Sequence, residues 1–188
     1  MTPRGAVACA LAASLTASCA PAAPRADSTQ LAVATGETRS ERTRWAVSPR
    51  HIGPVRIGMS LDSIASVLGL IVTDITPRGR MCAYVRPPNL PAGVSLLFVH
   101  DTLVRVDVDS TDVLTEEGVG VGDSEVGLLV RYAGNIRVEA HGVGSHTLHV
   151  SRPSNSTYVL TFETNGNLVQ RYKAGRRSVT QAAARCSA

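Results

Sequence analysis

Three histidines stand close together in the second half of the chain and could bind a metal ion. His141, His146 and His149 lie within nine residues, and histidines on the two sides of a hairpin can share a zinc ion. The glycines of the intervening segment Gly142–Ser145 favour a turn, and histidines beside a turn are usually solvated. Metal binding by these residues is therefore kept only as an alternative, and we expect no cofactor.

Two other segments carry groups that bind ions in some proteins. Asp107–Asp112 offers three carboxylates, but it lacks the glycine and the distal glutamate of a calcium-binding loop. Gly118–Gly122 has three glycines before an expected helix, but no Lys-Ser or Lys-Thr pair follows them as in a phosphate-binding loop. The sequence also has no G-x-S-x-G elbow and no C-x-x-C pair. We therefore expect a protein that is not an enzyme.

The N-terminus has the pattern of an export signal with a lipid attachment site. A charged start, Met1–Arg4, is followed by the small apolar residues of Gly5–Leu15 and then by Leu15–Cys19. The last segment resembles a bacterial lipobox, in which a small residue precedes the lipid-bearing cysteine. This predicts a signal peptide at residues 1–18 and lipid on Cys19. The alternative is an ordinary signal peptide cut near Ala20–Ala22, which would give a secreted or soluble periplasmic protein.

Two cysteines remain after the export signal. Export would place Cys82 and Cys186 in an oxidising compartment. Two cysteines in such a compartment form a disulfide if the fold brings them close together. The sequence therefore predicts a Cys82–Cys186 disulfide that fastens the C-terminal tail to the first half of the domain. Residues 19–44, rich in Ala, Pro, Ser and Thr, are expected to be a flexible tether.

The rest of the chain, residues 45–188, contains two similar units at about 51–109 and 114–176. In each unit a glycine precedes a serine, Ser60 or Ser124, that can cap a helix. Glycines Gly69 and Gly134 follow, where a helix often ends in a left-handed residue. The first expected helix has apolar residues at positions i, i+3, i+4 and i+7, namely Leu61, Ile64, Ala65 and Leu68.

Matching strands follow each expected helix. Val94–Val99 aligns with Tyr158–Glu163, and Cys82–Arg86 aligns with Thr147–Ser151. Asn165-Gly166 is a strong hairpin signal. Together these patterns predict one α+β domain, in which two tandem helix–β-strand units form an antiparallel sheet or pair of sheets with two helices packed on them, followed by a C-terminal tail.

The segment Gly53–Gly69, GPVRIGMSLDSIASVLG, resembles the opening of small bacterial envelope proteins. Among these are the outer-membrane assembly lipoproteins of the SmpA/OmlA (BamE) type and the β-lactamase inhibitory proteins, which carry two such units in tandem. The second half, Gly118–Ser187, is similar to an uncharacterised family of exported bacterial proteins. The resemblance implies a fold more than a function, and it implies no catalytic residue.

Composition and charge further limit the functions that the sequence allows. The chain has 188 residues, a net charge of +4 and only 4% aromatic residues. It has a single lysine and no basic block interleaved with aromatics, so we expect no nucleic-acid partner. We expect a non-catalytic lipoprotein of the bacterial cell envelope that faces the periplasm and binds another envelope protein. Ala20 after Cys19 favours the outer membrane. A small-ligand or metal-binding periplasmic module and an envelope hydrolase are the alternatives.

Overall fold

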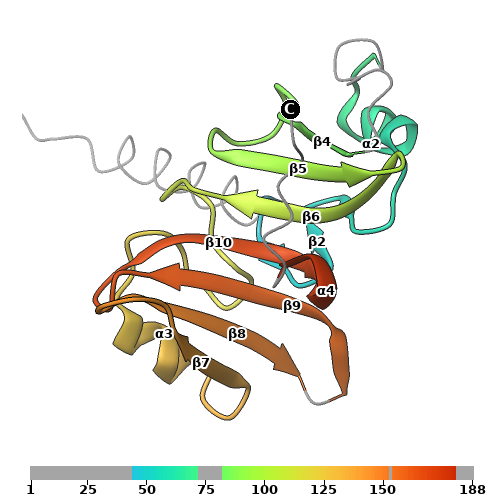
Figure 1. Cartoon of the computed structure of the whole chain (residues 1–188). Coiled ribbons are helices and arrows are strands. Elements are labelled where there is room, and N and C mark those ends of the chain that lie inside the picture. The colour runs from blue at the N-terminus through green and yellow to red at the C-terminus, as the bar shows by residue number, and fades with distance from the viewer. Residues whose placement is uncertain (1–43, 72–81, 153, 181–188) are drawn as a thin grey trace, which may run out of the picture.

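The computed structural model describes residues 44–71, 82–152 and 154–180, and most of them belong to a single large antiparallel sheet (Figure 1). Its strand order is β4-β5-β6-β10-β9-β8-β7. These strands are β4 (Cys82–Val85), β5 (Val94–Val99), β6 (Thr102–Val108), β7 (Ile136–Ala140), β8 (His146–Arg152), β9 (Asn155–Thr164) and β10 (Val169–Arg176). A second, small sheet consists of β1 (Val47–Ser48), β2 (His51–Ile52) and β3 (Val55–Arg56).

The large sheet is built from two successive meanders. The first contains β4, β5 and β6, and the second contains β7, β8, β9 and β10. They join where β6 pairs with β10, with Val108 opposite Tyr172 and Arg105 opposite Gly175. The strands of the two repeated units therefore form the two halves of one continuous sheet.

The expectation of an α+β domain with two helices packed on sheets is wrong. The described residues are mostly β, with ten strands in two antiparallel sheets. Their helices are short: α2 (Leu61–Leu68) has eight residues, α3 (Glu125–Arg131) seven and α4 (Arg177–Thr180) four. The helical pattern in the sequence lasts only two turns, whereas β9 continues for ten residues. In the part of the chain described, no helix is long and apolar enough to cross a membrane.

The helix boundaries themselves follow the expected caps. The Ser60 hydroxyl accepts a hydrogen bond from the Ser63 amide at 3.3 Å, and the Ser124 hydroxyl accepts one from the Gly127 amide at 3.1 Å. Gly69 ends α2 in the left-handed conformation, with φ 66°. The apolar face of α2 is buried as its spacing predicts, and its buried residues are Leu61, Ile64, Ala65 and Leu68.

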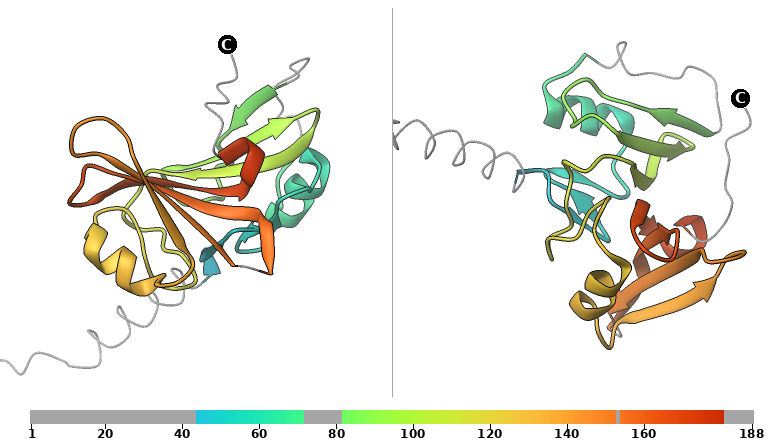
Figure 2. Two further views of the ribbon diagram at one scale, coloured as in Figure 1. Left: turned by 60° about the horizontal axis from the view of Figure 1, so that its bottom comes forward. Right: turned by 90° about the vertical axis from the view of Figure 1, so that its left-hand side faces the viewer.

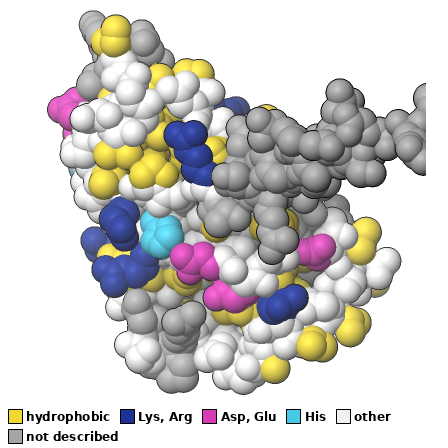
Figure 3. All heavy atoms as spheres, turned by 180° about the vertical axis from the view of Figure 1, so that it is seen from behind, with side chains coloured by type: hydrophobic (Ala, Val, Ile, Leu, Met, Phe, Trp, Pro, Cys, Tyr) yellow, Lys and Arg dark blue, Asp and Glu magenta, His cyan; other side chains and the backbone are white. Residues whose placement is uncertain are grey.

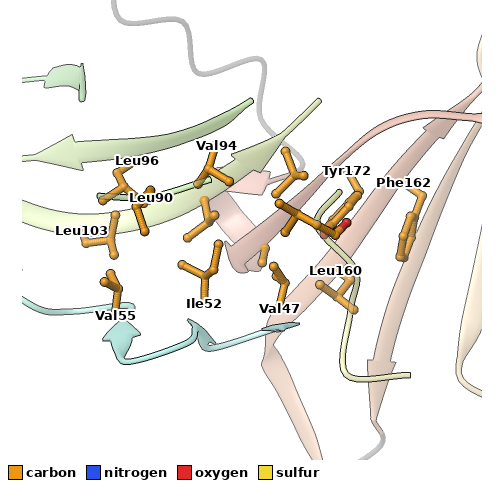
Figure 4. Packing of buried hydrophobic residues seen from close by; sticks show 14 of the residues in the cluster. Val47, Ile52, Val55, Leu90, Val94, Leu96, Leu103, Leu160, Phe162 and Tyr172 are labelled. Atoms are coloured by element: carbon orange, nitrogen blue, oxygen red, sulfur yellow. Dashed lines mark hydrogen bonds between the residues drawn. The ribbon is translucent and has the colours of Figure 1, made fainter. Parts of the chain in front are cut away.

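The core lies between one face of the large sheet and a layer made of the small sheet, α2 and α3. Figure 2 shows these elements on one side of the large sheet and α4 on the other. Aliphatic side chains from the small sheet, such as Val47, Ile52 and Val55, point toward the strands of the large sheet (Figure 4). Aromatic rings are concentrated under the second half, where Phe162 lies 5.3 Å from Tyr172 and 5.8 Å from Tyr132 between ring centroids.

Tyr172 connects this core to the long segment between β6 and α3. Its side chain is fully buried, and its hydroxyl donates a hydrogen bond of 3.0 Å to the Val113 carbonyl. Burial raises the pKa of Tyr172, so the hydroxyl remains a donor.

The Tyr172→Phe substitution is expected to lower the free energy of unfolding by about 1–3 kcal/mol, because it leaves the Val113 carbonyl buried without this donor. Urea unfolding followed by circular dichroism measures the change. The control is Tyr158→Phe, in which the half-buried ring stays beneath Arg50, whose guanidinium carbon is 4.9 Å from the ring centroid. Equal stability of Tyr172→Phe and the unchanged chain would contradict this role of the hydroxyl.

Candidate functional site

The structure does not bring the three histidines together. His146 and His149 lie on β8, three residues apart, so their side chains point to opposite faces of the sheet. His141 follows β7 and is exposed at the hairpin that leads into β8. Among the described residues no group of three or more His, Cys, Asp or Glu side chains could hold a metal ion. The spacing of these histidines therefore does not create a shared metal site.

His146 belongs instead to a polar contact that fastens α3 to the sheet. Its Nδ1 lies 2.8 Å from Oε1 of Glu125, the first residue of α3. The Thr164 hydroxyl on β9 donates to the same carboxylate. Burial alone would raise the pKa of Glu125, but the hydrogen bonds from Thr164 and His146 outweigh it and lower the pKa. Glu125 is therefore a buried, ionised anchor for α3.

His149 lies on the other face of the sheet, where it is almost fully buried. Its Nδ1 is 3.1 Å from the Thr161 hydroxyl, and its Nε2 is 3.5 Å from a carboxylate oxygen of Glu139. Burial lowers the pKa of His149 below its ordinary value of 6.5, although the Glu139 carboxylate acts in the opposite direction. Arg177 and Arg137 lower it further. The side chain is therefore neutral at pH 7.

The same face carries a second buried polar cluster around Arg105, which is only 3% exposed. The guanidinium donates to both carboxylate oxygens of Asp107, at 2.6 and 2.9 Å, to the Tyr84 hydroxyl, and to the Val179 carbonyl of α4 at 2.9 Å. Burial raises the pKa of Tyr84, and the nearby Asp107 carboxylate raises it further. Arg105 thus connects β4, β6 and α4, which is a structural role.

The acidic and glycine-rich segments also have structural roles. Asp107, the first carboxylate of 107–112, is held by Arg105. In the glycine segment, the Gly120 amide donates a hydrogen bond of 2.8 Å to the Asp123 carboxylate. This amide is therefore already bonded to a side chain of the protein.

The predicted cysteine sites lie mostly outside the described residues. Cys19 and Cys186 are not among them. Cys82 begins β4 and is disulfide-bonded. Since it is the one cysteine within the described ranges, its partner lies outside them, and the pairing of Cys82 with Cys186 stays a prediction.

The sequence patterns missed a group of exposed apolar side chains on and around α3. Val126 and Val130 are 70% and 73% exposed, and they lie one turn apart on the outer side of the helix. Leu168 lies at the beginning of the helix, where it is bridged to Ser124, and is 38% exposed. We name Val126, Val130 and Leu168 the α3 ridge. In the view from behind, hydrophobic side chains lie at the surface of the lower part of the molecule, which is the part that contains α3 in Figure 1 (Figure 3).

The lowered pKa of His149 makes stability depend on pH. As the pH falls below about 6.5, the unfolded chain takes up a proton at this residue before the folded protein does. The free energy of unfolding is therefore expected to decrease from about pH 7.5 to about pH 5.5. The His149→Gln variant should show a smaller decrease, measured by urea unfolding at both values.

The control is His141→Gln, which changes an exposed histidine at the hairpin. It should retain the full decrease. An equally steep decrease in His149→Gln would show that another group causes it.

No protein-family model, no curated protein and no solved structure matches the chain.

Proposed function

We propose that this protein is a non-catalytic, protein-binding module of the bacterial cell envelope, anchored to a membrane through lipid on Cys19. The α3 ridge carries this proposal. Two valines, each more than two thirds exposed on one side of a seven-residue helix, have no role in the core. Exposed apolar side chains that gather in this way are typical of surfaces that bind other proteins.

The way α3 is held supports a binding role for its outer side. The buried Glu125 carboxylate, with His146 and Thr164, fixes the beginning of the helix to β8 and β9. Leu128 on the inner side is fully buried. A rigidly held helix presents its outer side chains in one orientation, which reduces the entropy lost on binding.

The sequence supports the location. The charged and apolar start of the chain, the lipobox-like segment before Cys19 and the tether after it fit an exported protein held near a membrane. The resemblance of Gly53–Gly69 to the opening of envelope lipoproteins points the same way. His146 and His149 face opposite sides of the sheet, which argues against their sharing a metal ion.

The α3 ridge predicts a partner that depends on its valines. Tagged protein crosslinked in its native envelope should recover one partner at high stoichiometry, identified by mass spectrometry. The double variant Val126→Gln, Val130→Gln is expected to reduce recovery of that partner at least about tenfold, because it removes the exposed apolar surface of both valines.

The matched control is Val67→Gln, which changes an exposed valine on α2, 44% exposed, far from the ridge in the fold. It should recover the partner as the unchanged protein does. Equal recovery by all three proteins, or no partner with the unchanged protein, would contradict binding through α3.

Lipid anchoring is tested separately. The Cys19→Ala variant should move from the membrane fraction to the soluble fraction, because it lacks the acceptor of the lipid. Cys9→Ala changes a cysteine within the apolar stretch of the signal and should stay with the membrane. Full retention of Cys19→Ala in the membrane fraction would refute the anchor and leave the α3 proposal standing.

A further inference from the structure

The outer strand β7 has an open edge. It is the last strand of the large sheet, and in the part of the chain that the structure describes only β8 pairs with it. Its residues after Ile136 are all exposed. Proteins usually protect such edges with proline, a bulge, a covering segment or charged side chains, and β7 carries two opposite charges, Arg137 and Glu139. β7 has no proline, and its pairing with β8 runs without a register shift.

The hydrogen bonds at its two ends show which backbone groups face this edge. The His141 amide donates to the Ser145 carbonyl at 2.7 Å, and the Ser151 amide donates to the Asn135 carbonyl at 2.9 Å. Odd-numbered residues of this segment therefore bond toward β8. Because the direction alternates along a strand, the N–H and C=O groups of Ile136, Val138 and Ala140 point to the open edge.

The side chains of β7 alternate as well. Arg137 and Glu139 share one face, with Arg137 Nη2 3.3 Å from Glu139 Oε1, and their side chains are 78% and 46% exposed. Ile136, Val138 and Ala140 lie on the other face. A positive residue precedes Val138 and a negative residue follows it. If two copies of the strand run antiparallel about Val138, each positive residue therefore faces a negative one.

We propose that β7 pairs antiparallel with β7 of a second copy of this chain, with the two-fold axis at Val138. Val138 then exchanges backbone hydrogen bonds with Val138 of the second copy, and Ile136 does so with Ala140 of the second copy. These are the residues whose backbone groups have no partner among the described parts of the chain. Arg137 stands directly opposite Glu139 of the second copy, in the closely spaced type of pair where side chains interact best.

This register and this partner fit better than the alternatives. A two-fold axis at Ile136 or Ala140 would still let the outward-facing backbone groups bond to each other. It would not place Arg137 opposite Glu139 of the second copy. Pairing of β7 with β4, the opposite edge strand, would leave a free edge on each copy and continue into an open chain of molecules. The β7–β7 contact closes, and it extends one continuous sheet through both copies.

A charge-reversal cycle tests the proposal. The purified full chain carrying Cys19→Ala, so that lipid does not contribute, is followed by sedimentation equilibrium. Arg137→Glu and Glu139→Arg each place like charges opposite each other at two symmetric positions, and each should raise the dimer dissociation constant at least about tenfold. The double variant Arg137→Glu, Glu139→Arg restores opposite charges and should dimerise as the parent does.

Arg56→Glu is the matched control, because it makes the same charge change at an exposed residue of β3 and should leave dimerisation unchanged. A parent chain that sediments as a monomer at every concentration overturns the proposal. So does a double variant that stays as weak as the single ones. The proposal does not rest on α3 or on a partner protein, so it can fail or succeed independently of the proposed function.

Discussion

The pairing of β6 with β10 holds this molecule together, because each half of the chain adds its strands to one side of that pair. The two strands approach closely at Gly175, where an added Cβ would lie 2.4 Å from the Val104 carbonyl oxygen. Only glycine leaves room for this approach. The positions of the small sheet, α2 and α3 all follow, because they bury their apolar sides against the surface that this pairing makes continuous.

The two faces of the large sheet are buried in different ways. One face packs against aliphatic and aromatic side chains. The other carries Arg105 and His149, both buried, each paired with a carboxylate and a hydroxyl. A buried charged or polar group is tolerated when such partners replace water. Both faces of the large sheet therefore contain buried side chains, although Arg137 and Glu139 on the second face are exposed at the outer strand β7.

Local patterns predicted local structure well. Ser60, Gly69 and the four apolar residues between them defined α2, because caps and periodicity act within one element. The predicted α+β fold class was wrong because α2 and α3, with eight and seven residues, are minor elements beside a seven-stranded sheet. The exposed strand β7 was missed although Ile136–Ala140 alternates between apolar and other residues. The histidines, kept only as an alternative metal site, are separated because residues three apart on a strand face opposite ways. The role of Glu125 depends on Thr164, 39 residues away, and no spacing rule reaches that far.

The β6–β10 pairing also sets the order in which the chain can fold. Val108 and Tyr172 face each other across this pair although they are 64 positions apart in the sequence. Until the last quarter of the chain has emerged from a ribosome or a translocation channel, β6 has only β5 beside it, and one of its edges is unsatisfied. Pairings over such separations form slowly compared with local ones. A nascent chain of this design therefore passes through a half-sheet state with an unpaired edge on β6, which is prone to aggregation until β10 pairs with it.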